Sequence, residues 1–436
     1  MKSIKVGLLG LGTVGAGTFH VLRRNQAEIM RRAGRGIEIS MVSVRNLEKA
    51  QPIIDGACEL VGDSWLVVNN PEIDIVVELI GGTELTKELV LQAIANGKHV
   101  VTANKALLAM HGNEIFKAAQ DKGVIVAFEA AVAGGIPIIK ALREGLTANR
   151  IEWIAGIING TTNFILSEMR DKGLDFATVL KQAQELGYAE ADPTFDIEGV
   201  DAAHKATIMA AIAFGIPMQF DKAHIEGISK LEAIDINYAE QLGYRIKLLG
   251  ITKRTTKGIE LRVHPTLIPS KRLIANVEGA MNAVLVQGDA VGASLYYGKG
   301  AGAEPTASSV IADLVDITRL ATADPEHRVP HLAFQPQSIN QEVILPMSEI
   351  TTSYYLRLHV ADQAGVLADV TRIMADFAIS IDAMLQKEPA VNENQTDIIM
   401  LTHQTQEKNV LAAIAKIEQL SSVFGSVTKI RLEELS

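Results

Sequence analysis

The first third of the chain alternates short apolar runs with segments whose apolar residues recur at helical spacing. Helices are predicted over Lys87–Ala95 and from Asn104 to Ala119. Buried strands are predicted around them, at Ile4–Leu9, Ile37–Val44, Ile73–Ile80, His99–Thr102 and Val124–Phe128. This alternation is typical of a doubly wound parallel sheet, which we assign to residues 1–135.

The turn after the first predicted strand is rich in glycine and leads directly into an apolar helix. It reads Gly10-Leu11-Gly12-Thr13-Val14-Gly15, a G-x-G-x-x-G pattern. Such glycines permit a tight turn and a close approach of the backbone to a pyrophosphate, and the helix N-terminus offers N–H groups to the phosphates. A purely structural turn is the alternative. The strand–turn–helix setting favours a Rossmann-like domain that binds NAD(P).

Charged residues follow several of these strands. The second strand ends in Arg45, where an NAD-dependent enzyme would carry an acid. A cation there would accept the 2′-phosphate of NADP, although a solvated arginine at a strand end is the alternative. Lys105 and Glu129 follow two later strands. Ligands bind at the carboxyl edge of such sheets, so Lys105 is predicted to be a site residue.

After Pro137 the pattern changes, and residues 136–320 are predicted to form a second, α+β domain. A glycine-rich stretch, Tyr297–Gly302, precedes a predicted helix from Thr306 to Leu320. It suggests a return to the cofactor, or else a flexible crossover. The other elements predicted here are a helix at Ile138–Glu144 and strands at Ile151–Ile158, Ile259–Val263 and Val284–Gln287.

Residues 187–205 concentrate charge at the start of a predicted buried helix. Gly187 and Pro193 indicate a loop, and the apolar run Ala202–Ala213 indicates a helix. Asp201 and Lys205 are four residues apart and share one face of that helix. Charges that enter a core need partners, which favours a polar ligand over a solvated acidic loop. The carboxylates concerned are Glu190, Asp192, Asp196, Glu198 and Asp201.

The C-terminal part has a different residue pattern. Residues 321–348 hold four prolines with little periodicity and are predicted to be a linker. Residues 349–436 are predicted to form a separate, ferredoxin-like βαββαβ unit. Its elements are expected at Tyr354–Val360, Val366–Phe377, Ile379–Leu385, Asp397–Thr402, Val410–Leu420 and Ser426–Arg431.

Composition narrows the class of protein. A chain of 436 residues with 48% hydrophobic and 21% charged residues is typical of a globular enzyme of two or three domains. The net charge of −10 disfavours nucleic acid and anionic membranes as partners. Cys58 is the only cysteine, and no membrane-spanning run or signal-peptide pattern occurs. We therefore expect a cytoplasmic protein.

Five motifs in order resemble the homoserine dehydrogenase family, over roughly residues 1–320. They are Gly-Leu-Gly-Thr-Val-Gly at 10–15, Thr-Ala-Asn-Lys at 102–105, Asn-Gly-Thr-Thr-Asn at 159–163, Gly-Tyr-Ala-Glu-Ala-Asp-Pro at 187–193 and Asp-Ala-Ala-His-Lys at 201–205. The C-terminal unit, with Asp362 to Gly365 at its first strand–helix turn, resembles an ACT domain, which senses amino acids.

The resemblance implies interconversion of L-aspartate 4-semialdehyde and L-homoserine with NADP(H) or NAD(H), a step in threonine, methionine and isoleucine biosynthesis. It implies that Lys205 donates the proton and that Lys105 lies between nicotinamide and substrate. Glu190 and Asp201 would hold the substrate, supported by Asp196. The residues implied at the cofactor are Gly10, Gly12, Thr13, Val14, Gly15, Arg45, Lys105, Gly187, Glu190 and Gly302.

The resemblance also implies a monovalent cation, Na+ by expectation, bound by the Glu129 carboxylate and the carbonyls of Val132, Gly134 and Ile136. Threonine is the expected effector, and a homodimer or homotetramer the expected assembly. By the same resemblance, residues 136–320 would serve substrate binding and dimerisation. Two alternatives remain at this point. One is a phosphorylating semialdehyde dehydrogenase, which would need a thiol nucleophile such as Cys58. The other is a non-catalytic amino-acid sensor.

Overall fold

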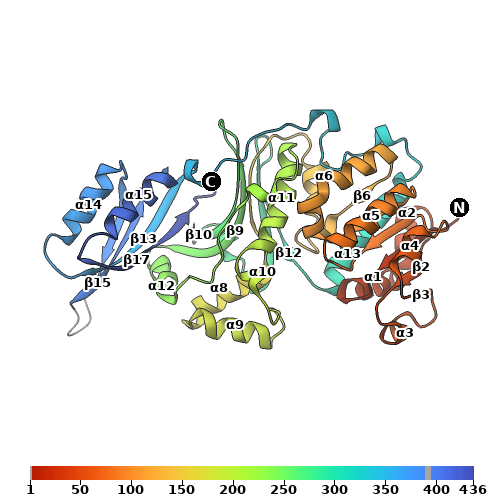
Figure 1. Cartoon of the computed structure of the whole chain (residues 1–436), viewed down its shortest axis with the longest axis horizontal. Helices are drawn as coiled ribbons and strands as arrows, with labels where there is room; N and C mark the ends of the chain where they lie inside the picture. The colour runs from red at the N-terminus through yellow and green to blue at the C-terminus, as the bar shows by residue number, and fades with distance from the viewer. Residues whose placement is uncertain (1, 388–393) are drawn as a thin grey trace.

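The computed structural model describes residues 2–387 and 394–436, and within these ranges no helix is long and apolar enough to cross a membrane. Three parts lie side by side along the long axis (Figure 1). They are an N-terminal sheet with its helices, a central sheet, and a C-terminal unit whose last strand leads back to the centre.

The N-terminal sheet has six parallel strands and confirms the predicted doubly wound fold. The chain runs outward from β1 to one edge and then crosses to the other side. The carboxyl ends of β1 and β4 therefore meet at the point where ligands bind in such folds. The spatial order is β3 (Glu59–Val61), β2 (Ile37–Ser43), β1 (Ile4–Leu9), β4 (Ile75–Glu78), β5 (His99–Thr102) and β6 (Val126–Ala127).

Helix α13 (Ala303–Leu320) returns from the second part of the chain to the N-terminal domain. It packs against α1 (Thr13–Arg24) so closely that a Cβ at Gly17 would lie 2.5 Å from the Ala303 carbonyl oxygen. Its apolar side chains complete the core behind β1 and β2, namely Ala307, Val310, Ile311, Leu314, Val315 and Ile317. The N-terminal core thus depends on a segment far away in the sequence.

The central and C-terminal parts share one mixed sheet of eleven strands. In order these are β12 (Gly292–Lys299), β11 (Met281–Gly288), β7 (Ile151–Ile157), β9 (Tyr244–Arg254), β10 (Ile259–Pro269), β17 (Val423–Leu432), β13 (Thr351–Ala361), β15 (Gln395–Thr402) and β14 (Ile381–Gln386). The short strands β8 (His224–Ile225) and β16 (Thr405–Gln406) pair with β10 and β13.

Two of the long strands, β9 and β12, are missed by the sequence pattern, as are the short β8 and β16. β9 carries Arg245, Lys247 and Lys253 among its apolar residues, which breaks the run that would mark a buried strand. β12 takes in the first half of Tyr297–Gly302, so the predicted glycine-rich turn is shortened to its last three residues. Helix α11 (Val200–Phe214) packs on the central sheet, and every residue from Asp201 onward is buried.

The C-terminal unit has the predicted βαββαβ order, with α14 (Val366–Asp376) and α15 (Glu407–Ile417) on one face of its strands. This unit is also joined to the central part of the chain. β17 pairs in parallel with β10 at Thr266–Arg431 and Leu267–Leu432, so the sheet continues from one part into the other. A pattern of residues within the unit contains no information about which strand its edge will join.

Candidate active site

The turn between β1 and α1 has the geometry of a phosphate-binding loop. Gly10 has a φ of +92°, which a residue with a side chain rarely adopts. At Gly12, none of the described heavy atoms lies within 4 Å of where a Cβ would be, so the backbone is open to a ligand. Gly12 also brings no side chain to cap α1, which leaves the N–H groups at Thr13 and Val14 for phosphate oxygens.

Other predicted cofactor residues lie along the same edge. The N–H of Gly10 donates to the Ser43 carbonyl at 3.0 Å, so the exposed Arg45 follows β2 directly beside the turn. Gly302, with a φ of +119°, precedes α13 where that helix packs on α1. This arrangement explains how a residue from the second part of the chain reaches the N-terminal sheet.

Glu78 is a buried carboxylate that sequence analysis missed. It ends β4 and accepts hydrogen bonds from the Thr102 hydroxyl at 2.6 Å and the Ile80 N–H at 2.9 Å. Thr102 in turn accepts from the N–H of Asn104 at 3.0 Å, which caps the helix that begins at Lys105. Burial raises the pKa of Glu78, although these hydrogen bonds oppose it. The sequence signal that could have identified Glu78 is an acid at the end of an apolar strand.

A cluster of charges lies where α6 (Lys105–Lys122) meets the start of α11. Asp201 accepts a hydrogen bond from the Lys205 ammonium at 2.7 Å, and its other oxygen forms an ion pair with Lys105 at 3.2 Å. Lys205 also donates to the carbonyl of Ile158 at 2.6 Å. The structure therefore brings together both predicted lysines and the carboxylate that sequence spacing placed beside one of them.

Asn159 joins the two carboxylates of the cluster, and its role was not predicted. Its amide donates to Asp196 at 2.7 Å and to Asp201 at 2.9 Å, while its side-chain oxygen caps α8 (Gly160–Lys172). The hydroxyl of Thr161 donates to the Tyr188 carbonyl at 2.6 Å. The Asn-Gly-Thr-Thr-Asn motif that contains these residues therefore positions the two acids. Its place directly after β7, where a residue caps the next helix, was the sequence signal for this role.

The charges of the cluster shift one another's proton affinities. Burial and the neighbouring Lys105 lower the pKa of Lys205, while Asp201 opposes them. Burial alone would raise the pKa of Asp201, but the two lysines outweigh it and hold that pKa below its usual value. Burial and Asp201 raise the pKa of Asp196. A buried ammonium with a lowered pKa, fixed beside a carboxylate, is suited to general acid–base chemistry.

The loop after α9 (Phe176–Glu185) makes fewer contacts with the charge cluster. Gly187 has a φ of +76°, and the side chain of Glu190 is exposed. In the described part of the chain, the contacts of Glu190 are those of its backbone carbonyl, which accepts from Gln184 at 3.1 Å. Asp192 caps Thr194 at 3.1 Å rather than pointing into the cluster. Of the five acids in this region, Asp201 contacts both lysines, and Asp196 joins the cluster through Asn159.

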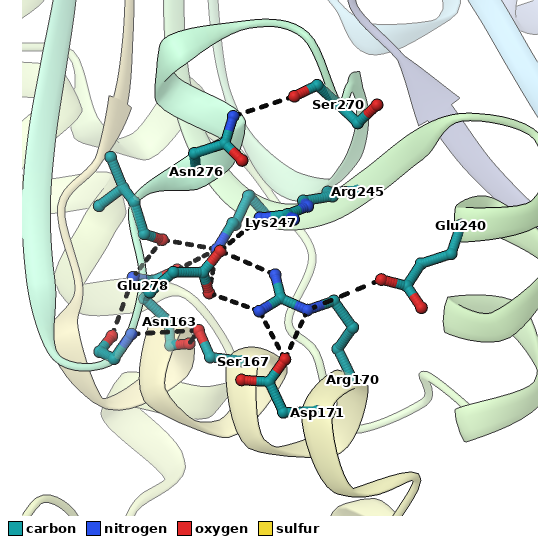
Figure 2. A network of polar contacts seen from close by, with 12 residues as sticks. Asn163, Ser167, Arg170, Asp171, Glu240, Arg245, Lys247, Ser270, Asn276 and Glu278 are labelled. Atoms are coloured by element: carbon teal, nitrogen blue, oxygen red, sulfur yellow. Dashed lines mark hydrogen bonds and ion pairs between the residues drawn. The ribbon is translucent and has the colours of Figure 1, made fainter.

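The start of α8 is anchored by a second polar network, centred on Lys247 and Glu278 (Figure 2). Lys247, 1% exposed, donates to the Asn163 side chain at 3.1 Å and to the Val277 carbonyl at 2.6 Å. Arg170 binds both oxygens of Glu278, at 2.8 and 3.0 Å. Burial lowers the pKa of Lys247 to about 8. This network anchors α8 to β9 and to the loop before β11.

The residues predicted to bind a cation lie at a sharp bend of the chain that follows β6. Glu129 is buried, and its carboxylate accepts the N–H groups of Ile139 and Lys140 at 2.9 and 2.8 Å, at the start of α7 (Ile138–Lys140). Burial, together with the neighbouring Asp313, raises the pKa of Glu129 to about 7.

The backbone between Glu129 and α7 is strongly bent. Ala133 and Gly134 both have positive φ, 54° and 51°. The Gly134 carbonyl accepts the Ser309 hydroxyl at 2.7 Å, and the Ile136 carbonyl accepts the N–H of Ile138 at 2.8 Å. Within the described ranges, no group of three or more His, Cys, Asp or Glu side chains is placed to hold a metal. A cation here would therefore need backbone carbonyls as ligands.

Cys58 lies outside the cluster, in the turn between α3 (Leu47–Ile54) and β3. Burial raises the pKa of its thiol to about 11, with Arg23 opposing. Such a thiol is protonated at neutral pH and is a poor nucleophile. This argues against a thiol-dependent semialdehyde dehydrogenase.

A dinucleotide-binding fold whose carboxyl edge meets two lysines and two carboxylates defines a nicotinamide-dependent oxidoreductase. Residues 137–315 match the family model of homoserine dehydrogenase, residues 10–129 that of the homoserine dehydrogenase NAD binding domain, and residues 354–421 that of the ACT domain. The chain belongs to the homoserine dehydrogenase family, and its C-terminal unit is an ACT domain.

Known relatives agree with this assignment. A homoserine dehydrogenase from Pseudomonas aeruginosa is 62% identical, with 100% of both chains covered. The crystal structure of a homoserine dehydrogenase from Thiobacillus denitrificans is 71% identical, with a TM-score of 0.96 over 100% of this chain and 99% of that one. A hyperthermophilic archaeal homoserine dehydrogenase in complex with NADPH is 25% identical, with a TM-score of 0.62 over 74% of this chain and 99% of that one. The enzyme therefore interconverts L-aspartate 4-semialdehyde and L-homoserine, and neither alternative is supported.

Proposed function

We propose that Lys205 is the proton donor to the substrate oxygen and that Asp201 and Asp196 bind the polar groups of the substrate. Reduction of the aldehyde needs a hydride at the carbonyl carbon and a proton at the oxygen. The nicotinamide cofactor supplies the hydride when bound. The observation that carries the proposal is the buried Lys205–Asp201 hydrogen bond of 2.7 Å, with Lys105 on the other carboxylate oxygen.

In this proposal Lys205 gives one proton to the oxygen as the hydride reaches the carbon, and a new hydroxyl forms. Neutral Lys205 then takes a proton from solvent. In the reverse direction it removes the hydroxyl proton. Asp201 keeps the ammonium oriented, and Lys105 lies between the nicotinamide and the substrate. Glu190, on the exposed loop after α9, completes the binding of the substrate's ammonium.

Formation of NADPH from NADP+ that depends on L-homoserine tests the reaction on which these residue roles rest. We expect turnover with L-homoserine and none with L-serine, whose chain is one carbon shorter. Iodoacetamide should leave the rate unchanged, because the Cys58 thiol lies outside the cluster. A purified, folded enzyme without homoserine-dependent turnover would disprove the assignment.

Arg45 supports a preference for NADP over NAD, because it stands beside the phosphate-binding turn where an acid would bind the ribose of NAD. The NADPH bound to the archaeal relative is consistent with this. Arg45→Ala should raise the KM for NADPH about tenfold and leave that for NADH nearly unchanged. The matched control is Arg35→Ala, an arginine away from the turn that donates to the Thr318 carbonyl. Equal effects of Arg45→Ala on both cofactors would show that Arg45 does not contact the 2′-phosphate.

The proposal includes Na+ bound by Glu129 and the carbonyls of Val132, Gly134 and Ile136. One feature supports a fit. The buried Glu129 lies near a second carboxylate, Asp313, and a cation would add to Lys140, which pairs with Asp313 at 3.3 Å, in offsetting their repulsion. The cation would hold the bend between β6 and α7 and would not contact the reacting atoms.

Threonine as an effector at the ACT domain and a homo-oligomeric state complete the proposal. One face of the central sheet carries a row of paired apolar side chains, Leu295, Leu285, Ala155 and Ile251, across four strands. Leu285 and Leu295 are only partly buried, and β12 is an edge strand. Such a face and edge favour association with a second copy. Threonine-dependent inhibition of the intact enzyme, and its mass in solution, test these assignments.

A further inference from the structure

The segment Glu226–Asp235 connects the ACT domain to the acids of the active site. It begins directly after β8, which pairs with β10 at His224 and Ile225. β17 of the ACT domain pairs with β10 only a few residues further along. The segment ends at α12 (Ala233–Gln241), which lies beneath the ACT sheet (Figure 1). Both of its ends are therefore next to the ACT domain.

The first end is held by a buried arginine. Arg431, 1% exposed, donates to both oxygens of Glu226 at 2.8 Å each. The same guanidinium donates to Glu407, the first residue of α15, at 2.9 and 2.6 Å. A bidentate pair of this kind is directional as well as strong. Glu226 is thus attached to a group that is itself fixed to an ACT helix.

The second end is held in the same way. Asp235, on the first turn of α12, is 0% exposed. It accepts hydrogen bonds from Arg357 at 2.6 and 3.1 Å and from the Tyr355 hydroxyl at 2.9 Å, both on β13. Two arginines on adjacent ACT strands therefore hold the segment at positions nine residues apart in the sequence.

The middle of the segment supports the turn between Asp196 and Asp201. The N–H of Ile228 donates to the Ile197 carbonyl at 2.8 Å. Gly227 lies against the same carbonyl and against Glu198, so closely that a Cβ at this position would overlap both. The turn that it supports leads from α10 (Thr194–Ile197), which carries Asp196, into α11, which carries Asp201.

We propose that Glu226 and Gly227 are positioning residues for the dehydrogenase reaction, through which the ACT domain sets the separation of Asp196 and Asp201. Arg431 fixes Glu226, the backbone passes this position on to Gly227 and Ile228, and these residues define where the turn at Ile197 can lie. Lys205 is one helical turn further on and has its own anchor at Ile158. The arrangement therefore acts on substrate binding more than on proton transfer. It rests on the proposed substrate role of the two acids.

Glu226→Gln tests this inference, since the amide keeps the shape of the side chain and loses its charge. We expect the KM for L-homoserine to rise about tenfold, with kcat and the KM for NADP+ changed by less than about threefold. Gly227→Ala should raise the homoserine KM further, because its Cβ displaces Ile197. Thermal unfolding shows that each variant is folded at the assay temperature, and Glu226→Gln remains informative if Gly227→Ala does not fold.

The matched control is Glu232→Gln. Glu232 also pairs with an ACT arginine, Arg357 at 2.8 Å, but its side chain is 63% exposed and it lies four residues beyond Ile228, whereas Glu226 is next to Gly227. Its homoserine KM should stay near that of the unmodified enzyme. Asp196→Asn, measured beside these variants, separates the two proposals. If it leaves the homoserine KM unchanged, the substrate role of Asp196 fails. If it raises that KM while Glu226→Gln does not, or if Glu232→Gln raises it as much as Glu226→Gln, the positioning role is wrong.

Discussion

Lys205→Ala is expected to lower kcat about 10²–10⁴-fold, the usual contribution of a general acid, with little change in cofactor binding. The ammonium is buried on α11 and fixed by Asp201 and the Ile158 carbonyl, so no other described group on that helix replaces it. The phosphate-binding turn lies on a different domain. Dissociation constants for NADPH, measured by its fluorescence, should therefore remain within about twofold of those of the unmodified enzyme.

Lys247→Met is the matched control for this prediction. Lys247 is also a buried lysine with a lowered pKa, about 8, but it anchors α8 and lies outside the charge cluster. Its loss removes the Lys247 donor from the Asn163 side-chain oxygen and leaves the Val277 carbonyl with the Asn163 amide alone, which should reduce the free energy of unfolding by roughly 1–3 kcal/mol. Turnover of the folded variant should be nearly normal. Near-normal turnover in Lys205→Ala would instead disprove the role of Lys205.

The parts of the site that depend on neighbouring residues could be predicted from the sequence. The turn at Gly10 to Gly15 follows from one strand and one helix, and the Asp201–Lys205 pair follows from helical periodicity alone. Lys105 was predictable because every strand of a parallel sheet ends at the same edge. In each case the physical constraint is contained within a dozen residues or in a general rule of the fold.

The parts that depend on contacts between distant segments could not be predicted. Glu78 joins the edge of the candidate site because Thr102, on the next strand, donates its hydroxyl to it. Asn159 does so because α10 and α11 fold back onto the end of β7. The continuous sheet has the same origin, since the edge of β10 accepts β17 only in three dimensions. These contacts explain why the ACT domain shares a sheet with the central part of the chain, although its own residue pattern predicts a separate unit.

That continuity changes how regulation should be tested. Truncation near residue 348 would remove β17 and leave Glu226 and the buried Asp235 without their arginines. A buried carboxylate without its partner is strongly destabilising. We therefore expect a truncated enzyme to lose stability as well as any response to threonine. Point variants in the turn that carries Gly365 would separate effector binding from folding.

Asp201→Asn is expected to reduce kcat/KM for semialdehyde reduction roughly 10²-fold or more and to move the alkaline limb of its pH profile to lower pH. Asp201 raises the pKa of Lys205, whereas burial and Lys105 lower it. An amide of the same shape removes the first effect and leaves the other two, so the pKa of Lys205 falls. Reduction requires the protonated amine and is therefore lost at a lower pH than in the unmodified enzyme.

The reverse reaction provides the internal check on this prediction. Homoserine oxidation requires the neutral amine, so its acidic limb should move to lower pH by the same amount as the alkaline limb of reduction. Asp192→Asn is the matched control, because Asp192 is an exposed acid of the same region that caps Thr194 and does not contact either lysine. The limbs of the pH profile of the Asp192→Asn enzyme should stay where they are in the unmodified enzyme. Unshifted limbs in both directions for a folded Asp201→Asn enzyme would show that Asp201 does not control the proton on Lys205, and a shift in one direction alone would assign that limb to another group.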